Sequence, residues 1–236
     1  MQENKSPLTV SQALKGYTGS GLTITILVLA AYECIFYAGA YASMALVIAL
    51  SDGTSFMEAI ANIAETPAGD CIMAFAPALI NCLILLVPND RSAPGGKLFR
   101  TFKGGFDTYK KSRIGIYVSA ALAALIFSLF AMLLDITGLA KVQNSIFAET
   151  AVFVSSLAAL GAGTLALIIR NDSARGFISV IVCFAVNAGV AIALNILTTL
   201  NGSILPHIVV GIIGAVISVI AAKAYLSYYK KNLWDS

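Results

Sequence analysis

Long apolar intervals, separated by short polar ones, run through the 236 residues of the chain. A helix that crosses a lipid bilayer needs about 20 mainly apolar residues. On this basis the hydrophobic pattern predicts an all-α integral membrane protein with six transmembrane helices, at about 21–50, 69–87, 114–140, 150–169, 176–200 and 204–225. The first interval is longer than a span requires, and Gly39 is the predicted place for a bend or a close helix contact.

The N-terminal residues 1–20 predict an interfacial segment. Ser6 and Pro7 are the residue types of a helix start, and a weakly amphipathic helix after them would lie along the membrane surface. The segment has no apolar core followed by a small-residue cleavage site. A removable signal peptide is therefore not expected.

Two further features are expected around the second span. Ser55 and Glu58 have capping-box spacing and predict a short helix outside the bilayer that ends before Pro67. Pro77 lies inside the second apolar interval. Because proline removes a backbone donor, it predicts a kink and a freed carbonyl there.

The loop 88–113 is the one long polar interval after the first span. Its residues 91–113 hold seven of the fifteen basic residues: Arg91, Lys97, Arg100, Lys103, Lys110, Lys111 and Arg113. At helical spacing, one narrow sector would hold four aromatic rings with two lysines at its flank: Phe99, Phe102, Phe106, Tyr109, Lys103 and Lys110. Such a surface suits a membrane headgroup layer or a groove on a soluble partner.

Two glycines, Gly104 and Gly105, interrupt this aromatic stripe. Because glycine weakens a helix by up to about 1 kcal/mol, we expect two helical pieces, at 97–103 and from Phe106 into the third span. The preceding PGGK lacks the glycine spacing and the Ser or Thr of a phosphate-binding loop. The chain is therefore not expected to be an enzyme that hydrolyses ATP.

The distribution of charge predicts the orientation. Cytoplasmic segments of membrane proteins carry an excess of Lys and Arg, and with both termini inside only Lys141 of the fifteen basic residues falls outside. We therefore expect a cytoplasmic N-terminus, C-terminus and loop 88–113, in a multi-pass protein of the bacterial cytoplasmic (plasma) membrane. The tyrosines and lysines of residues 225–234 predict an inner interfacial anchor.

Composition agrees with a membrane protein. Hydrophobic residues make up 58% of the chain and charged residues 11%, whereas about a quarter of residues are charged in soluble domains. The net charge of +3 therefore reflects which side of the membrane the basic residues occupy. No nucleic-acid partner is expected. The four cysteines show no CxxC spacing, and neither a metal nor a disulfide is expected.

Glu33 is the one carboxylate well inside a predicted span. A buried charge there costs at least about 2.5 kcal/mol, so such residues face a bundle interior or a wet cavity. On a helical wheel it shares a face with Leu29, Tyr37, Ala40 and Met44. It is either a residue of a substrate path, together with Tyr37, or a structural carboxyl hydrogen-bonded to Tyr37.

Other polar residues in the spans have two interpretations. Asn81 and Asn187 are candidates for the substrate path, although hydrogen bonding between helices is their commoner role. Small-residue pairs at 161–163 and 211–214 predict close helix packing. His207, the only histidine, has no second ligand near it in the sequence, so a metal site is not expected.

This layout resembles the membrane subunit of an ABC-2-type exporter in its interfacial helix, six spans, outer helix and inner loop. The resemblance implies a permease subunit that binds no cofactor itself and pairs with an ATP-binding cassette ATPase, which holds ATP and Mg. It also implies a second permease subunit, in a homodimer or a heterodimer. The docking role would fall to Lys97–Lys111, and an amphiphilic or peptide-like substrate would pass Glu33. The family's longer re-entrant segment after span five is absent here.

A second hypothesis belongs to a different class. The protein would be a non-transporting membrane protein whose basic cytoplasmic loop binds anionic membrane lipid or recruits a partner. Each Lys or Arg near an anionic surface contributes about 1 kcal/mol. A secondary transporter is a third option, but the spans lack the paired charges of proton coupling.

Overall fold

The computed structural model describes residues 8–64, 67–86, 99, 101, 104–136, 145–169 and 175–231. Within these ranges the chain is helical and has no strand. Two short helices accompany six longer ones: α1 (Val10–Thr18), α2 (Leu22–Asp52), α3 (Phe56–Ala64), α4 (Pro67–Leu86), α6 (Gly105–Ile136), α7 (Ser145–Ile169), α8 (Arg175–Asn201) and α9 (Leu205–Tyr229).

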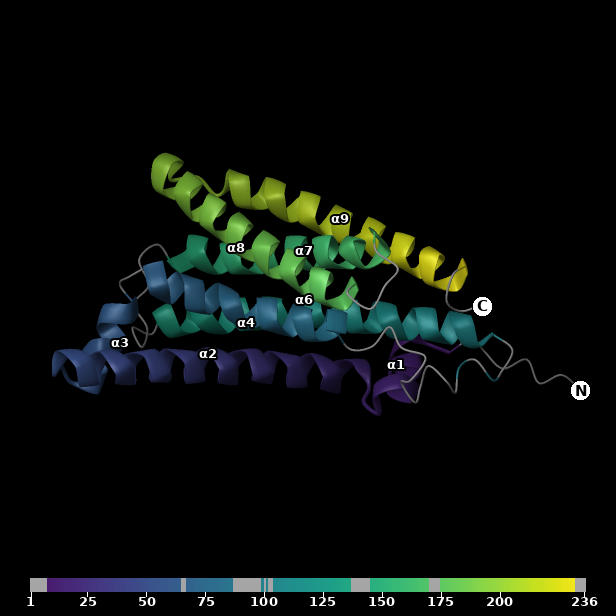
Figure 1. The fold of residues 1–236 in the computed structure, drawn as a ribbon, viewed down its shortest axis with the longest axis horizontal. Coiled ribbons are helices and arrows are strands. Elements are labelled where there is room, and N and C mark those ends of the chain that lie inside the picture. The colour runs from purple at the N-terminus through teal and green to yellow at the C-terminus, as the bar shows by residue number, and fades with distance from the viewer. Residues whose placement is uncertain are drawn as a thin grey trace, which may run out of the picture.

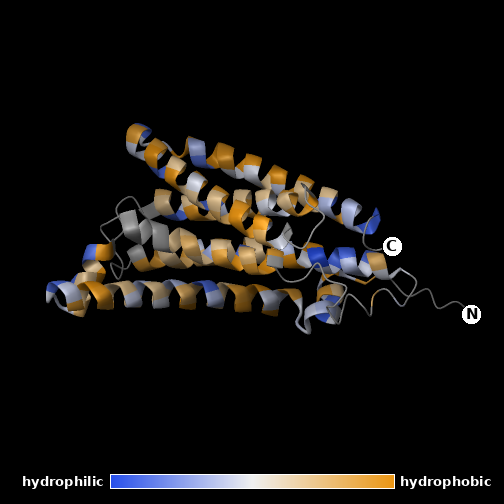
Figure 2. Ribbon diagram, viewed as in Figure 1, coloured by the Kyte–Doolittle hydropathy of each residue, from blue (hydrophilic) through white to orange (hydrophobic). Residues whose placement is uncertain are grey.

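Five of these helices, α2, α6, α7, α8 and α9, are long and apolar enough to cross a membrane. α4 supplies a shorter apolar stretch, Met73–Leu85. Many large apolar side chains are exposed, and Ile35, Leu200 and Ile212 are each more than half exposed. Hydrophobic residues recur along all the long helices (Figure 2). Lipid tails would cover such a surface, whereas soluble monomers rarely expose large apolar patches. The expected α-helical, multi-pass membrane architecture therefore agrees with the structure.

The helix α7 is the centre of the bundle. It packs against α4, α6, α8 and α9, while α2 lies on one flank against α4 and α6 (Figure 1). Within the apolar windows, 67% of the α7 residues are buried but only 11% of those in α2. α1 lies at the end of the bundle where α6 begins and α9 ends, which we call the basic end because it carries Lys110, Lys111, Lys230 and Lys231. α3 lies at the opposite end.

Close packing of α7 depends on glycine. A Cβ on Gly161 would lie 2.7 Å from Ser218 Oγ of α9, and one on Gly163 would lie 3.2 Å from Cys183 Cβ of α8. From the other side, a Cβ on Gly214 would lie 3.2 Å from the Ala158 nitrogen. These contacts confirm the predicted packing at 161–163 and 211–214.

The expectation for Gly39 is wrong. Its surroundings are empty within 4 Å of a Cβ position, and α2 continues through it as one helix. Gly39 lies on the exposed side of α2, so a small side chain there serves no contact within this chain.

The boundaries of α1 and α3 test the sequence pattern. α1 begins at Val10 after a Thr9 cap that exchanges hydrogen bonds with Gln12. Ser6 and Pro7, where a helix start was predicted, lie outside the described residues. The hydroxyl of Ser55 accepts a hydrogen bond from Glu58 N–H at 3.2 Å. α3 then ends at Ala64, before the proline, as predicted.

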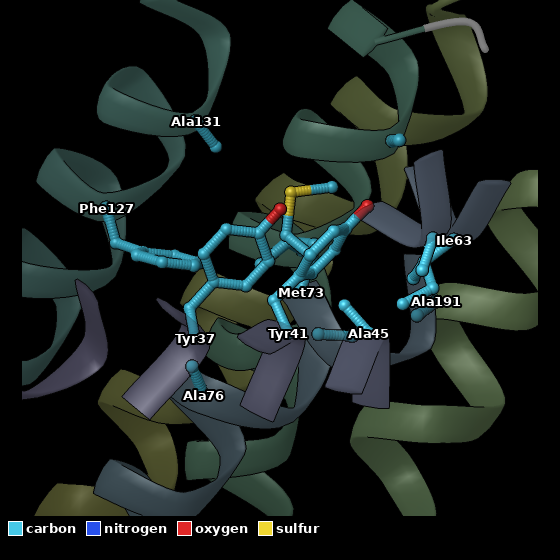
Figure 3. Packing of buried hydrophobic residues seen from close by; sticks show 13 residues of the cluster. Tyr37, Tyr41, Ala45, Ile63, Met73, Ala76, Phe127, Ala131 and Ala191 are labelled. Atoms are coloured by element: carbon cyan, nitrogen blue, oxygen red, sulfur yellow. The ribbon is translucent and has the colours of Figure 1, made fainter. Parts of the chain in front are cut away.

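The core near α3 is an aromatic cluster on the buried face of α2 (Figure 3). The rings of Tyr37 and Tyr41 lie 5.3 Å apart, and Tyr37 meets the edge of Phe127 from α6 at 5.6 Å. Met73 of α4 packs over the two tyrosines, and small residues of α2, α4 and α6 surround them. This cluster fastens α2 to the rest of the bundle.

Candidate functional site

The predicted loop joins α6 through a tight backbone turn. Gly104 has a φ of +84°, in the left-handed region that favours glycine. Gly105 is the first residue of α6, and a Cβ there would overlap the carbonyl of Phe99. The predicted break at these glycines is confirmed, and α6 runs from it without interruption into the third apolar interval. The helix begins one residue before Phe106, the predicted start of this helical piece, and nine residues before the expected start of the third span at Ile114.

Six aromatic side chains lie together at the basic end: Tyr17, Phe99, Phe106, Tyr109, Tyr225 and Tyr229. We call them the basic-end cluster. Tyr17 of α1 stacks on Phe99 with 6.1 Å between centroids, and its edge meets Tyr109 at 6.2 Å. Tyr109 of α6 stacks on Tyr229 of α9 at 4.9 Å. The cluster therefore joins α1, the end of the loop, α6 and α9.

The helix α1 is fastened to α6 beside this cluster. Leu14 is fully buried, and a Cβ on Gly115 would lie 3.3 Å from Leu14 Cδ2 and 3.2 Å from Val10 Cγ1. The Lys111 ammonium donates a hydrogen bond to the Leu8 carbonyl at 2.6 Å. An interfacial position for α1 stays a prediction, but its packing on α6 was not expected.

Arg113 is the main departure from the expected polar loop. It is 0% exposed, although the sequence pattern places it at the edge of a solvated segment. Its guanidinium carbon lies 5.6 Å from the ring centroid of Tyr117, within range of a cation–π interaction. Among the described residues its nitrogens have no hydrogen-bond partner. The continuous α6 turns this side chain into the bundle, which the polar pattern of the loop did not indicate.

The predicted docking stripe is divided by the structure. Phe99 and Tyr109 are 3% and 1% exposed, so in this conformation they pack inside the chain and do not form an exposed stripe. Phe106 is half-buried beneath the Lys230 ammonium at 5.4 Å, and Lys110 is exposed. The remaining candidates lie outside the described residues: Lys97, Arg100, Phe102 and Lys103.

The C-terminal tyrosines also have a different place from the one expected. Tyr225 and Tyr229 are both 1% exposed and pack in the basic-end cluster, so they are not interfacial anchors. The two tyrosines are four residues apart, so they lie on the same side of a helix. This spacing could have indicated a shared buried face.

Glu33 faces the bundle interior, as expected for an intramembrane carboxylate. It is 1% exposed, and its Oε2 has no hydrogen-bond partner among the described residues. The buried face of α2 also contains Tyr37 and Tyr41. Met44, expected on this face, is 37% exposed. A hydrogen bond between Glu33 and Tyr37 and a role of Glu33 in a substrate path both stay predictions.

The two asparagines tie helices together. Asn81 Nδ2 of α4 donates to the carbonyl and the hydroxyl oxygen of Ser156 in α7, at 3.0 and 2.9 Å. Asn187 Nδ2 of α8 donates to the Ala74 carbonyl at 2.8 Å, in the α4 turn that precedes Pro77. The interpretation as interhelical bonds is confirmed. Their membership of a substrate path stays a prediction.

His207 is buried beside the Phe147 ring, with 5.9 Å between centroids. Among the described residues, no group of three His, Cys, Asp or Glu side chains could hold a metal ion.

Comparison of the chain with protein-family models, curated proteins and solved structures finds no match. The function of the chain is therefore inferred from its own residues and their geometry.

Proposed function

We propose that the chain is the membrane-spanning permease subunit of an ATP-driven exporter resembling the ABC-2 type. It would cross the bacterial cytoplasmic membrane six times, with α4 as the additional span. α4 has 20 residues, about 30 Å at 1.5 Å per residue, which matches a hydrocarbon core. The asparagine hydrogen bonds that join α4 to α7 and α8, and its packing against α2, α6, α7 and α8, support this role.

The proposed orientation places the basic end in the cytoplasm. The start of α6 and the end of α9 carry lysines at this end, and basic residues are retained on the cytoplasmic side. Both termini and the loop 88–113 would then be cytoplasmic. α3, with Glu58 in its first turn, would lie outside.

The observation that carries the proposal is the direct joining of the loop to a spanning helix. α6 has 32 residues and runs from the glycine turn at Gly104 across the bundle. The basic-end cluster links the same turn to α1 and α9. Because packed helices move as rigid elements, a force applied to the loop by a partner would be passed to α6 and α9 together.

The partner would be an ATP-binding cassette ATPase, which binds ATP and Mg, and a second permease subunit would complete the path. The docking contacts would be the loop residues 88–103 with exposed Lys110. The rings of Phe99 and Tyr109 would transmit force inside the subunit. An amphiphilic or peptide-like substrate would pass between the two subunits, next to α2 and Glu33.

Co-purification with an ATPase tests this proposal. Tagged full-length chain, isolated in mild detergent after crosslinking, is expected to retain ATP hydrolysis. A Phe102→Ala/Lys103→Gln variant should lose most of that activity while its Tm is unchanged. Lys15→Gln/Lys231→Gln is the control, because both lysines are exposed and neither belongs to the loop. No ATPase with the native chain, or full activity in the loop variant, would contradict the proposal.

The alternative is a non-transporting protein whose loop binds anionic lipid or recruits another partner. It is favoured by the burial of Phe99 and Tyr109, which leaves the loop fewer apolar contacts for an ATPase. In this case, binding of a loop 88–104 peptide to anionic vesicles would fall steeply with salt. The chain purified from native membranes would bring no ATPase with it.

A further inference from the structure

A groove with a volume of about 900 Å³ runs between α6 and α9, with α7 as its floor. α7 packs on both α6 and α9, whereas the described residues of α6 and α9 scarcely contact each other along their lengths. The two outer helices meet closely at the basic end, where Tyr109 stacks on Tyr229. The groove therefore lies between two helices that are held together by this ring contact at the basic end.

The walls of the groove have the length and polarity of a lipid chain. They extend from Phe106 to Ala121 on α6 and from Lys230 to Ala215 on α9. At 1.5 Å per residue each wall is about 22 Å long, comparable with half of a bilayer core of about 30 Å plus a headgroup. Away from the basic end the lining is mainly apolar, with Val118, Leu160 and Val219.

Cationic side chains line the groove near the basic end. Lys110, Lys223 and Lys230 all line it and are exposed, and Asp107 is the one carboxylate among the lining residues. Lys223 is the only Lys, Arg, Asp or Glu in α9. A long lysine stem can follow an apolar wall while its ammonium reaches the headgroup level. The three ammonium groups therefore leave a net positive charge at one end of an apolar channel.

We propose that this groove binds an anionic membrane phospholipid. Its phosphate would lie among Lys110, Lys223 and Lys230, and one acyl chain would lie along Val118, Leu160 and Val219. A zwitterionic phospholipid would bring its own cation beside the three ammonium groups, and a water-soluble anion would leave the apolar walls uncovered. The site needs no ATPase, so it can be present whether or not the proposed exporter activity is.

Lipid titration of the purified full chain tests the charged half of the site. Phosphatidylglycerol and phosphatidylcholine with the same acyl chains are compared, with bound lipid counted by native mass spectrometry. Phosphatidylglycerol should be retained preferentially. Lys223→Gln/Lys230→Gln should weaken its retention about tenfold or more. Lys15→Gln/Lys231→Gln removes the same charge from residues that do not line the groove and should change retention less than about twofold.

A second variant tests the apolar half. Val118→Trp places a large ring on the exposed wall of α6 and should displace phosphatidylglycerol although all three lysines remain. Its Tm without added lipid should match that of the native chain, which separates loss of binding from loss of folding. Equal retention of both lipids, or equal effects of the two lysine pairs, would overturn the proposal. Undiminished binding of phosphatidylglycerol to the tryptophan variant would also overturn it. The same holds if a second copy of the chain is found to occupy the groove.

Discussion

The ring of Tyr109 in α6 stacks on the ring of Tyr229 in α9, with 4.9 Å between centroids and 19° between planes. Both residues are 1% exposed. Of the ring–ring contacts described, theirs brings α6 and α9, the two walls of the groove, closest together. Tyr17 joins the same cluster from α1. Three helices that are distant in the sequence are thus held at one point, beside the turn that connects the loop to α6.

A double-mutant cycle measures this contact. Tyr109→Ala and Tyr229→Ala should each lower the free energy of unfolding by about 3–5 kcal/mol. The stacked pair should show a coupling of about 0.5–1.5 kcal/mol. Tyr32→Ala is the control, because Tyr32 is 60% exposed, and it should cost about 0.5 kcal/mol or less. Strictly additive losses would show that the two rings do not interact.

Glycine substitutions distinguish packed from open helix faces. Gly161→Ala places a methyl group 2.7 Å from Ser218 Oγ, so α7 and α9 must separate at a cost of about 1–3 kcal/mol. Gly39→Ala meets no atom within 4 Å and should be neutral or add up to about 1 kcal/mol through helix propensity. Heating in detergent while labelling the buried thiols of Cys82 and Cys183 reports both effects. Equal midpoints for the two variants would contradict this packing.

The turn at the start of α6 predicts a local effect on the loop. Gly105→Ala would overlap the Phe99 carbonyl, so the end of the loop must leave its place against α6. We expect trypsin to cleave residues 97–103 several-fold faster in this variant. Gly189→Ala is the matched control, because a Cβ there meets nothing within 4 Å. Unchanged cleavage in Gly105→Ala would show that Phe99 is not held by this turn.

Hydrophobic periodicity was sufficient for the helices but not for their contacts. The apolar runs predicted all the long helices, and Ser55 and Pro67 marked the start and the end of α3, because these signals are local. The start of α6 was predicted within one residue, at Phe106, although the third span itself was expected to begin only at Ile114. Lys110 to Arg113 are polar in sequence, but the structure shows them inside a helix that continues from Gly105.

The candidate site depended on contacts that the sequence pattern could not show. Phe99 and Tyr109 share a helical sector in the sequence, which suggested one exposed stripe. The structure buries both rings because Tyr17 and Tyr229 come to the same place from opposite ends of the chain. Only interhelical packing determines that meeting. Asn81 and Asn187 were easier, because amides in a span need a partner on a neighbouring helix.

The orientation of the bundle underlies the docking of a partner on the loop, and cysteine accessibility measures it directly. Single cysteines are placed at exposed Met57 in α3 and exposed Ser227 in α9, in a chain whose native cysteines are replaced by alanine: Cys34, Cys71, Cys82 and Cys183. A membrane-impermeant maleimide added to intact cells should label Met57→Cys at once. Ser227→Cys should react only after the cells are permeabilised. Labelling of Ser227→Cys in intact cells, with Met57→Cys protected, would contradict a cytoplasmic basic end and the partner-driven function proposed for it.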